Sequence, residues 1–148
     1  MNSTRKYTVC PATSDDDITA CFDCMHELRP GIERDTFVSR VRVMEKEGYR
    51  IASITDAGKV VAVAGYRYMH TLFGGDTLYV DDLITLPEER SRGYGAALID
   101  WLRDQATQRG CKMLHLDSGV QRARAHQFYF ASGMHVNCFH FAQALHED

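Results

Sequence analysis

Several features that would mark a special class of protein are missing from this sequence of 148 residues. No apolar run reaches the roughly eighteen residues that a membrane span needs, and the first residues do not resemble a signal peptide. The net charge of -3 provides no general attraction to nucleic acid. Internal repeats and low-complexity segments are also absent. We therefore expect one cytoplasmic domain over residues 1–148, without a membrane or nucleic-acid partner.

Cysteine and histidine form no recognisable framework. The five cysteines are an odd set, and their spacing does not suggest paired bridges. Cys21 and Cys24 match half of a redox or zinc motif, but both fall within a helical pattern and no second ligand pair has suitable spacing. We expect these two thiols to be buried. The seven histidines match no zinc pattern either, so the sequence predicts no metal site.

The composition is that of a globular domain, with 45% hydrophobic and 25% charged residues. Ser14 and Asp17 resemble a capping box before the first apolar helical stripe. Helices are predicted where apolar residues recur every three or four positions, at 18–28, 34–47, 95–108 and 122–132. Strands are predicted in runs rich in β-branched and aromatic residues, at 7–10, 49–55, 59–69, 77–86, 111–117 and 134–142.

The order of these elements, β-α-α-β-β-β-α-β-α-β, predicts an α/β (α+β) fold with a mixed sheet and helices on both faces. The two β-α-β stretches, around Gly95 and Phe128, imply neighbouring parallel strands with right-handed crossovers. Residues 70–76 are predicted to be a loop because they contain Gly74-Gly75. A ligand is expected at the carboxyl ends of the parallel strands.

The segment Arg90–Ala96, with the sequence RSRGYGA, lies between a predicted strand and a predicted helix. Gly93 and Gly95 have no Cβ, so backbone N–H groups at the start of the helix can approach an anion closely. Arg90 and Arg92 add two permanent charges with forked donors that suit phosphate. The segment predicts a phosphate-binding turn, and the plainer alternative is a polar turn before a helix.

Arg90, Gly93 and Gly95 fit the pattern Q/R-x-x-G-x-G/A. A second pattern, N-x-x-A-x-x-F-Y-x-x-x-G-F, is matched by Ala125, Phe128, Tyr129, Gly133 and Met134, with Arg122 in place of the usual asparagine. With these two motifs, essentially the whole chain resembles the GNAT superfamily of acyl-coenzyme-A N-acyltransferases. The closing run, from RARAHQFY through FHFAQAL, also resembles the C-terminal part of aminoalkylphosphonate acetyltransferases.

The resemblance implies a mostly antiparallel sheet with one parallel pair at the cofactor site, and acetyl-CoA as the acyl donor without a metal. Backbone groups of the preceding strand are implied to hold the pantetheine arm and the acetyl carbonyl, where they would also stabilise the developing oxyanion. The implied cofactor-binding residues are Leu83, Ile84, Thr85, Arg90, Ser91, Arg92, Gly93, Tyr94, Gly95, Ala96, Arg122, Ala125 and Phe128.

Asp81 and Asp82 are the candidate bases for removing a proton from the acceptor amine. Strand alternation sends them to opposite faces, so only one can face the acceptor unless a bulge intervenes. We favour Asp81, which shares a face with Tyr79 and Leu83. The alternatives are that these carboxylates bind the substrate ammonium, pair with an arginine, or form a solvated edge.

Tyr129 is the candidate general acid, because the resemblance places its counterpart beside the coenzyme A sulfur and a phenol stays protonated at pH 7. The alternative is a buried aromatic, and His126 is an alternative acid or base. The resemblance implies that the first two helices and the 70–76 loop form the acceptor pocket. If the acceptor carries an acidic group, an arginine must neutralise it, and Arg29, Arg67 and Arg122 are the candidates.

The favoured function is an N-acetyltransferase that acts on a primary amine of a small molecule by direct attack in a ternary complex. A catalytically silent acyl-CoA binding or sensing domain is the first alternative, and a turn that binds some other nucleotide is the second. The family also implies a homodimer.

Overall fold

The computed structural model describes residues 7–146, which divide into two compact units, 7–116 and 117–146. The first unit holds a five-stranded sheet in the order β1-β2-β3-β4-β5. Every neighbouring pair is antiparallel except β4 and β5, which are parallel. The strands are β1 (Cys10–Pro11), β2 (Arg50–Asp56), β3 (Lys59–Thr71), β4 (Gly75–Thr85) and β5 (Met113–Leu116). The mixed, mostly antiparallel sheet predicted from the sequence is confirmed.

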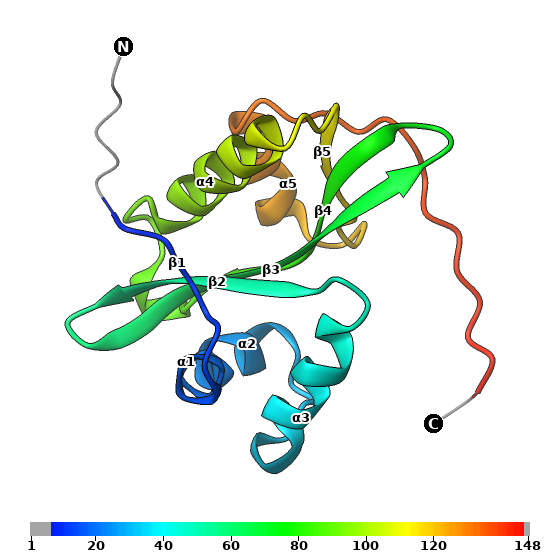
Figure 1. The fold of residues 1–148 in the computed structure, drawn as a ribbon. Helices are drawn as coiled ribbons and strands as arrows, with labels where there is room; N and C mark the ends of the chain where they lie inside the picture. The colour runs from blue at the N-terminus through cyan, green and yellow to red at the C-terminus, as the bar shows by residue number, and fades with distance from the viewer. Residues whose placement is uncertain (1–6, 147–148) are drawn as a thin grey trace. The chain divides into compact units, whose positions relative to one another are not determined.

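Helices cover both faces of this sheet (Figure 1). On one face lie α1 (Asp15–Ala20), α2 (Phe22–Leu28) and α3 (Arg34–Glu45), and on the other lies α4 (Tyr94–Gln108). The buried positions of α4 recur at helical spacing and include Leu98, Trp101 and Leu102. The Trp101 ring packs edge-on against Tyr66 of β3, with centroids 5.7 Å apart. The apolar stripe of α4 therefore ties the helix to the strands that lead to the glycine turn.

The start of the first helix follows the sequence, but its length does not. Ser14 accepts a hydrogen bond from the Asp17 backbone, and the Asp17 carboxylate accepts one from the Ser14 backbone, which confirms the capping box. The single helix predicted over 18–28 is wrong, because the chain leaves the helix at Cys21, whose N–H donates to Ile18 O in a tighter turn. Cys21 and Cys24 are both buried, as expected.

The hairpin formed by β3 and β4 is longer than the sequence suggests. The loop predicted over 70–76 is wrong at both ends, because His70 pairs with Asp76 and Thr71 pairs with Gly75 in the ladder. Only residues 72–74 lie outside the strands. The Thr71 hydroxyl accepts a hydrogen bond from Gly74 N, and Gly75 has a φ of 67°, so a short turn suffices to reverse the chain.

The second unit contains α5 (Ala123–Ala131), close to the predicted helix, and no strand within its described residues, 117–146. The strand predicted over 134–142 is wrong, as is the second parallel pair expected around Phe128. Val136, Phe139 and Phe141 are exposed, and their spacing does not keep the strict alternation of a half-buried strand. Between residues 7 and 146, no helix has both the length and the apolar character needed to cross a bilayer.

Candidate active site

The predicted phosphate-binding turn connects β4 to α4. After β4, a 3₁₀ turn, η1 (Pro87–Glu89), leads into Arg90, whose backbone is extended. Ser91 and Gly93 both adopt left-handed backbone conformations, with φ of 66° and 89°. Such a φ is unfavourable for most side chains, and glycine supplies it at the N-cap without strain. The chain thus turns sharply and starts α4 at Tyr94, one residue before the predicted start.

The first turn of α4 has backbone donors without a helical acceptor. Ala97 N makes the first helical hydrogen bond, to Gly93 O, so the N–H groups of residues 94–96 have no acceptor within the helix. No side chain caps this end, and the first turn holds no acidic residue. Arg90 is exposed beside it, and the guanidinium of Arg92 lies 3.1 Å from Glu89 Oε2. A 15-residue helix with open N–H groups and a neighbouring arginine can hold an anionic group such as a diphosphate.

Two tyrosines brace this turn, and the sequence reasoning missed both contacts. The Tyr7 hydroxyl donates to the Arg92 carbonyl at 2.6 Å, and its ring packs on Tyr94 with centroids 4.5 Å apart. The Tyr94 hydroxyl in turn donates to Asp56 Oδ2 at 3.2 Å. Tyr7 lies 85 positions before Arg92, so no local pattern could have joined them.

After the segment of β4 that pairs with β5, one edge of β4 has no strand partner among the described residues. The β4–β5 ladder covers only Thr77–Val80, whereas the β3–β4 ladder continues through Thr85. Leu83, Ile84 and Thr85 are therefore paired with β3 on one side only. This edge leaves backbone groups available to an extended ligand directly before the glycine turn.

A β-bulge lies at Asp81. Gly65 pairs with Asp82 and Tyr66 pairs with Val80, so Asp81 is an extra residue of β4 without a partner on β3. A bulge changes the direction of the side chains near it. Two consecutive residues there need not point to opposite faces of the sheet. The two carboxylates accordingly belong to one hydrogen-bond network rather than to two separate environments.

In this network each carboxylate is bound by an arginine. Arg67 holds Asp81 with two hydrogen bonds, Nε to Oδ1 at 3.0 Å and Nη2 to Oδ2 at 2.8 Å. Arg29, the C-cap residue after α2, donates from Nε to Asp82 Oδ1 at 2.9 Å and from Nη2 to the Asp81 carbonyl at 2.9 Å. The arginine pairing that the sequence left as an alternative is thus present for both residues.

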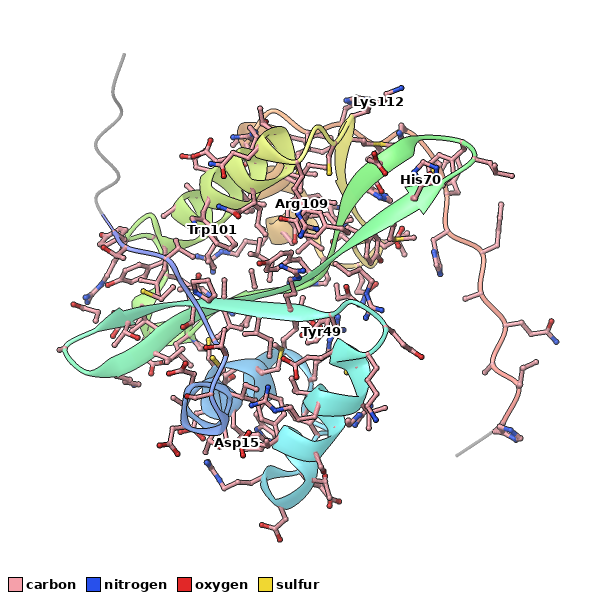
Figure 2. The ribbon with its side chains drawn as sticks, viewed as in Figure 1. Asp15, Tyr49, His70, Trp101, Arg109 and Lys112 are labelled. Carbon is pink, nitrogen blue, oxygen red and sulfur yellow. The ribbon has the colours of Figure 1, made fainter. Side chains whose placement is uncertain are left out.

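Tyr49, the residue directly before β2, completes the network and is labelled in Figure 2. Its hydroxyl donates to Asp82 Oδ2 at 2.6 Å, and Arg67 lies over its ring. Burial, followed by the negative charge of Asp82, raises the pKa of Tyr49 far above the ordinary value of a phenol, so it stays a donor. Gly65 makes room for this contact, since a Cβ there would overlap both Tyr49 Oη and Asp82 Oδ2.

The other candidate residues lie in the second unit. Arg122 is the N-cap residue of α5, and Ala125, Phe128 and Tyr129 lie within that helix. Tyr129 is half-buried, and burial raises its pKa although Arg122 acts in the opposite direction. A phenol in this setting is protonated at neutral pH. His126 Nε2 lies 2.7 Å from the Gly119 carbonyl, within hydrogen-bond distance.

The hairpin residues expected in an acceptor pocket have different neighbours. His70, whose ring nitrogen is 2.7 Å from Asp76 Oδ1, lines a hollow of about 490 Å³ with Tyr68, Arg109 and Cys111. Figure 2 labels Arg109 at the end of α4, and no residue of the first two helices lines this hollow. Over the part of the chain that the structure describes, no group of three or more His, Cys, Asp or Glu residues could hold a metal ion.

The chain is similar to known acetyltransferases in sequence and in fold. The sequence profile of the Acetyltransferase (GNAT) family matches residues 16–134. The uncharacterized N-acetyltransferase YhdJ of Bacillus subtilis is 31% identical over 118 residues, which cover 79% of this chain and 83% of that protein. The aminoalkylphosphonate N-acetyltransferase of Salmonella typhimurium is 32% identical over 66 residues, or 45% of this chain and 43% of that protein.

The likeness to solved structures extends over nearly the whole fold. The aminoglycoside N-acetyltransferase AAC(6')-Iy in complex with CoA superposes with a TM-score of 0.80 at 15% identity, covering 93% of this chain and 94% of that chain. A putative acetyltransferase from Agrobacterium tumefaciens gives 0.79 at 21% identity, covering 93% and 99%. The solved structures share the fold, and the profile match together with the sequence relatives shows that the chain is an acyltransferase enzyme and belongs to the GNAT family of acetyltransferases.

Proposed function

We propose that this protein transfers an acetyl group from acetyl-CoA to the primary amine of a small molecule, by direct attack within a ternary complex. The observation that carries the proposal is the start of α4, where N–H groups without helical acceptors, a left-handed Gly93 and an exposed Arg90 lie together. These features fit a diphosphate, because the helix dipole and the open donors both favour negative charge.

The donor would be held along β4 and the turn that follows it. Residues 90–96 would bind the diphosphate, and the edge of β4 at Leu83, Ile84 and Thr85 would bind the pantetheine arm through its backbone. Arg122, Ala125 and Phe128 remain proposed contacts from the second unit. The donor supplies an activated thioester, and a backbone N–H directed at its carbonyl would stabilise the developing negative charge.

The acceptor amine must lose a proton before it attacks. An ammonium with a pKa near 10.4 is neutral in only about one molecule in 2,500 at pH 7, a penalty of roughly 4.6 kcal/mol. We assign Asp81 to take up this proton through a water molecule, since its side chain is 22% exposed whereas that of Asp82 is 10% exposed. Asp82 accepts from Arg29 and Tyr49, which suits it to hold the network in place.

Tyr129 is assigned as the acid that protonates the leaving thiolate. Its raised pKa keeps the proton on the phenol at working pH, so it can donate as the carbon–sulfur bond breaks. Loss of the hydroxyl should remove this step and leave the aromatic ring to pack as before.

The test is acetyl transfer, measured as release of free thiol from acetyl-CoA across a panel of amines, with wild type and Tyr129→Phe. We expect the variant to lose roughly 10²- to 10⁴-fold in kcat, with its Kd for coenzyme A nearly unchanged. A wild-type protein that binds acetyl-CoA tightly and acetylates no amine would instead support the silent binding domain. Displacement of acetyl-CoA by ATP at similar concentration would support a site for another nucleotide.

A further inference from the structure

Arg29 and Arg67 present a pair of fixed cations beside the proposed acetyl donor. Both guanidinium groups are held through Nε and Nη2, by Asp82 and the Asp81 carbonyl for Arg29 and by the Asp81 carboxylate for Arg67. Within residues 7–146, these bonds leave Nη1 of each arginine with its two N–H donors unused. An arginine already fixed by one edge loses little further freedom when its other edge binds an anion.

The four charged residues Arg29, Arg67, Asp81 and Asp82, called the cluster from here on, differ in how far their side chains are exposed. The Asp82 side chain is the most buried member at 10% exposed, Arg67 and Asp81 are 20% and 22% exposed, and Arg29 is 50% exposed. A ligand that arrives from solvent therefore meets the Arg29 cation first and the carboxylates behind it. Each carboxylate already has its own arginine, so the cluster offers no unpaired negative charge to an acceptor with several positive charges.

The cluster also lies close to the part of β4 that is proposed to bind the pantetheine arm. Asp81 is the bulged residue of β4, two positions before Leu83, where the unpaired edge begins to face the proposed pantetheine arm. An acceptor bound to Arg29 and Arg67 would thus reach the thioester from the side where Asp81 is exposed. The bulge brings the cations, the proton acceptor and the strand edge together in one short stretch.

We propose that Arg29 and Arg67 bind an acidic group of the acceptor, so that the substrate is a small zwitterion, a primary amine that carries a carboxylate or a phosphonate. This inference rests on the proposed acetyltransferase function and specifies its substrate class. The acid group binds the Nη1 edges of the two arginines, and the ammonium lies toward Asp81, which takes up its proton through a water molecule. Arg29 is the residue that determines specificity, because it is the exposed one.

The test compares short primary amines that differ chiefly in the group opposite the reacting amine. β-Alanine and 2-aminoethylphosphonate carry an acid, propylamine carries a methyl group, and putrescine carries a second amine. We expect at least one of the two acids to exceed propylamine and putrescine in kcat/KM by roughly tenfold or more. The faster acid then identifies carboxylate or phosphonate as the natural group. Equal rates, or a preference for putrescine, would overturn the inference.

Arg29→Gln removes the exposed cation and keeps a shorter, uncharged polar side chain. It should lower the ratio of kcat/KM for the acid to that for propylamine by roughly 10- to 100-fold, mainly through KM. Arg29→Lys should recover part of this ratio because it restores the charge without the fork. Arg40→Gln, at an exposed arginine on α3, is the matched control and should leave the ratio unchanged. An unchanged ratio in Arg29→Gln would contradict the assignment.

A binding measurement separates this inference from the proposed function. If no amine is acetylated, the proposed function fails, and both acids are then titrated by calorimetry into protein saturated with coenzyme A. Binding heat with wild type that Arg29→Gln loses would support the anion site without any turnover. The absence of binding heat with wild type would overturn it.

Discussion

Gly65→Ala tests whether the close packing around Asp82 holds the site together. A Cβ at position 65 would overlap Tyr49 Oη and Asp82 Oδ2, and it would lie 2.6 Å from Tyr49 Cζ. Both side chains are buried, so they have little room to move away. Restoring ordinary contact needs a shift of roughly 1 Å, which breaks the 2.6 Å hydrogen bond between Tyr49 and Asp82.

The expected cost combines two effects. A buried carboxylate oxygen that loses its donor costs about 1–3 kcal/mol, and overpacking costs about 1–3 kcal/mol more. Because alanine has less conformational entropy than glycine in the unfolded chain, the substitution also stabilises the folded state by about 0.4–1 kcal/mol. The free energy of unfolding should therefore fall by about 1–5.5 kcal/mol, as measured by urea denaturation. Gly31→Ala is the control, because a Cβ there meets nothing within 4 Å, and it should raise stability by about 0.4–1 kcal/mol through the same entropy effect alone.

A double-mutant cycle identifies the cause. In Tyr49→Phe the hydroxyl is already gone, so Gly65→Ala should cost less in that background, by about 0.5 kcal/mol or more. The residual overlap with Cζ and Asp82 keeps the cost above zero. A loss of less than about 0.5 kcal/mol for Gly65→Ala alone, or strict additivity in the cycle, would refute the reasoning.

Three further predictions concern stability and the glycine turn. Burial raises the pKa of Cys21 to about 11 and of Cys24 to about 12, so these thiols ionise first in the unfolded chain. The free energy of unfolding should then fall as pH rises above about 9, by roughly 1.4 kcal/mol for each pH unit and each thiol. In Cys24→Ala, urea denaturation at a series of pH values should show a smaller fall in this free energy with pH. Ser14→Ala removes the capping box and should lower the free energy of unfolding by about 1 kcal/mol, and no measurable loss would contradict the cap. Tyr7→Phe should weaken coenzyme A binding severalfold in a calorimetric titration while the fold stays intact, because it frees the Arg92 carbonyl, and unchanged affinity would contradict the brace.

The sequence was sufficient wherever structure depends on local spacing. The Ser14–Asp17 cap, the end of α3 before Gly48 with its φ of 92°, and the turn at Gly93 follow from residues within a few positions of each other. Periodicity also found the core of α4, since Trp101 and its neighbours recur at helical spacing. These signals located the glycine turn and its helix correctly.

The arrangement of the candidate site could not be predicted in the same way. The bulge at Asp81 is a property of the hydrogen-bond register between β3 and β4, which the alternation along one strand does not contain. Arg29 and Asp82 are 53 positions apart, so their pairing depends on where α2 packs on the sheet. The sequence named both arginines and both aspartates but could not say that they bind each other.

For the segment after α5, the sequence predicted an element that the structure does not contain. Its apolar residues were interpreted as a strand, yet Phe139 and Phe141 are 80% and 91% exposed and no strand forms in residues 134–146. A strand needs a backbone partner, and side-chain composition alone does not supply one. The homodimer expected from the family stays a prediction, and light scattering at several protein concentrations would test it.

The hydrogen bond from Tyr7 to Arg92 has a practical consequence for anyone who produces this protein. A shortened version of the chain that begins after Tyr7 would lose this contact with the loop proposed to bind the diphosphate. The loss would be seen as weaker saturation with the acetyl donor in a sample that is otherwise folded. Shortened versions made for crystallisation or assays therefore have to keep Tyr7.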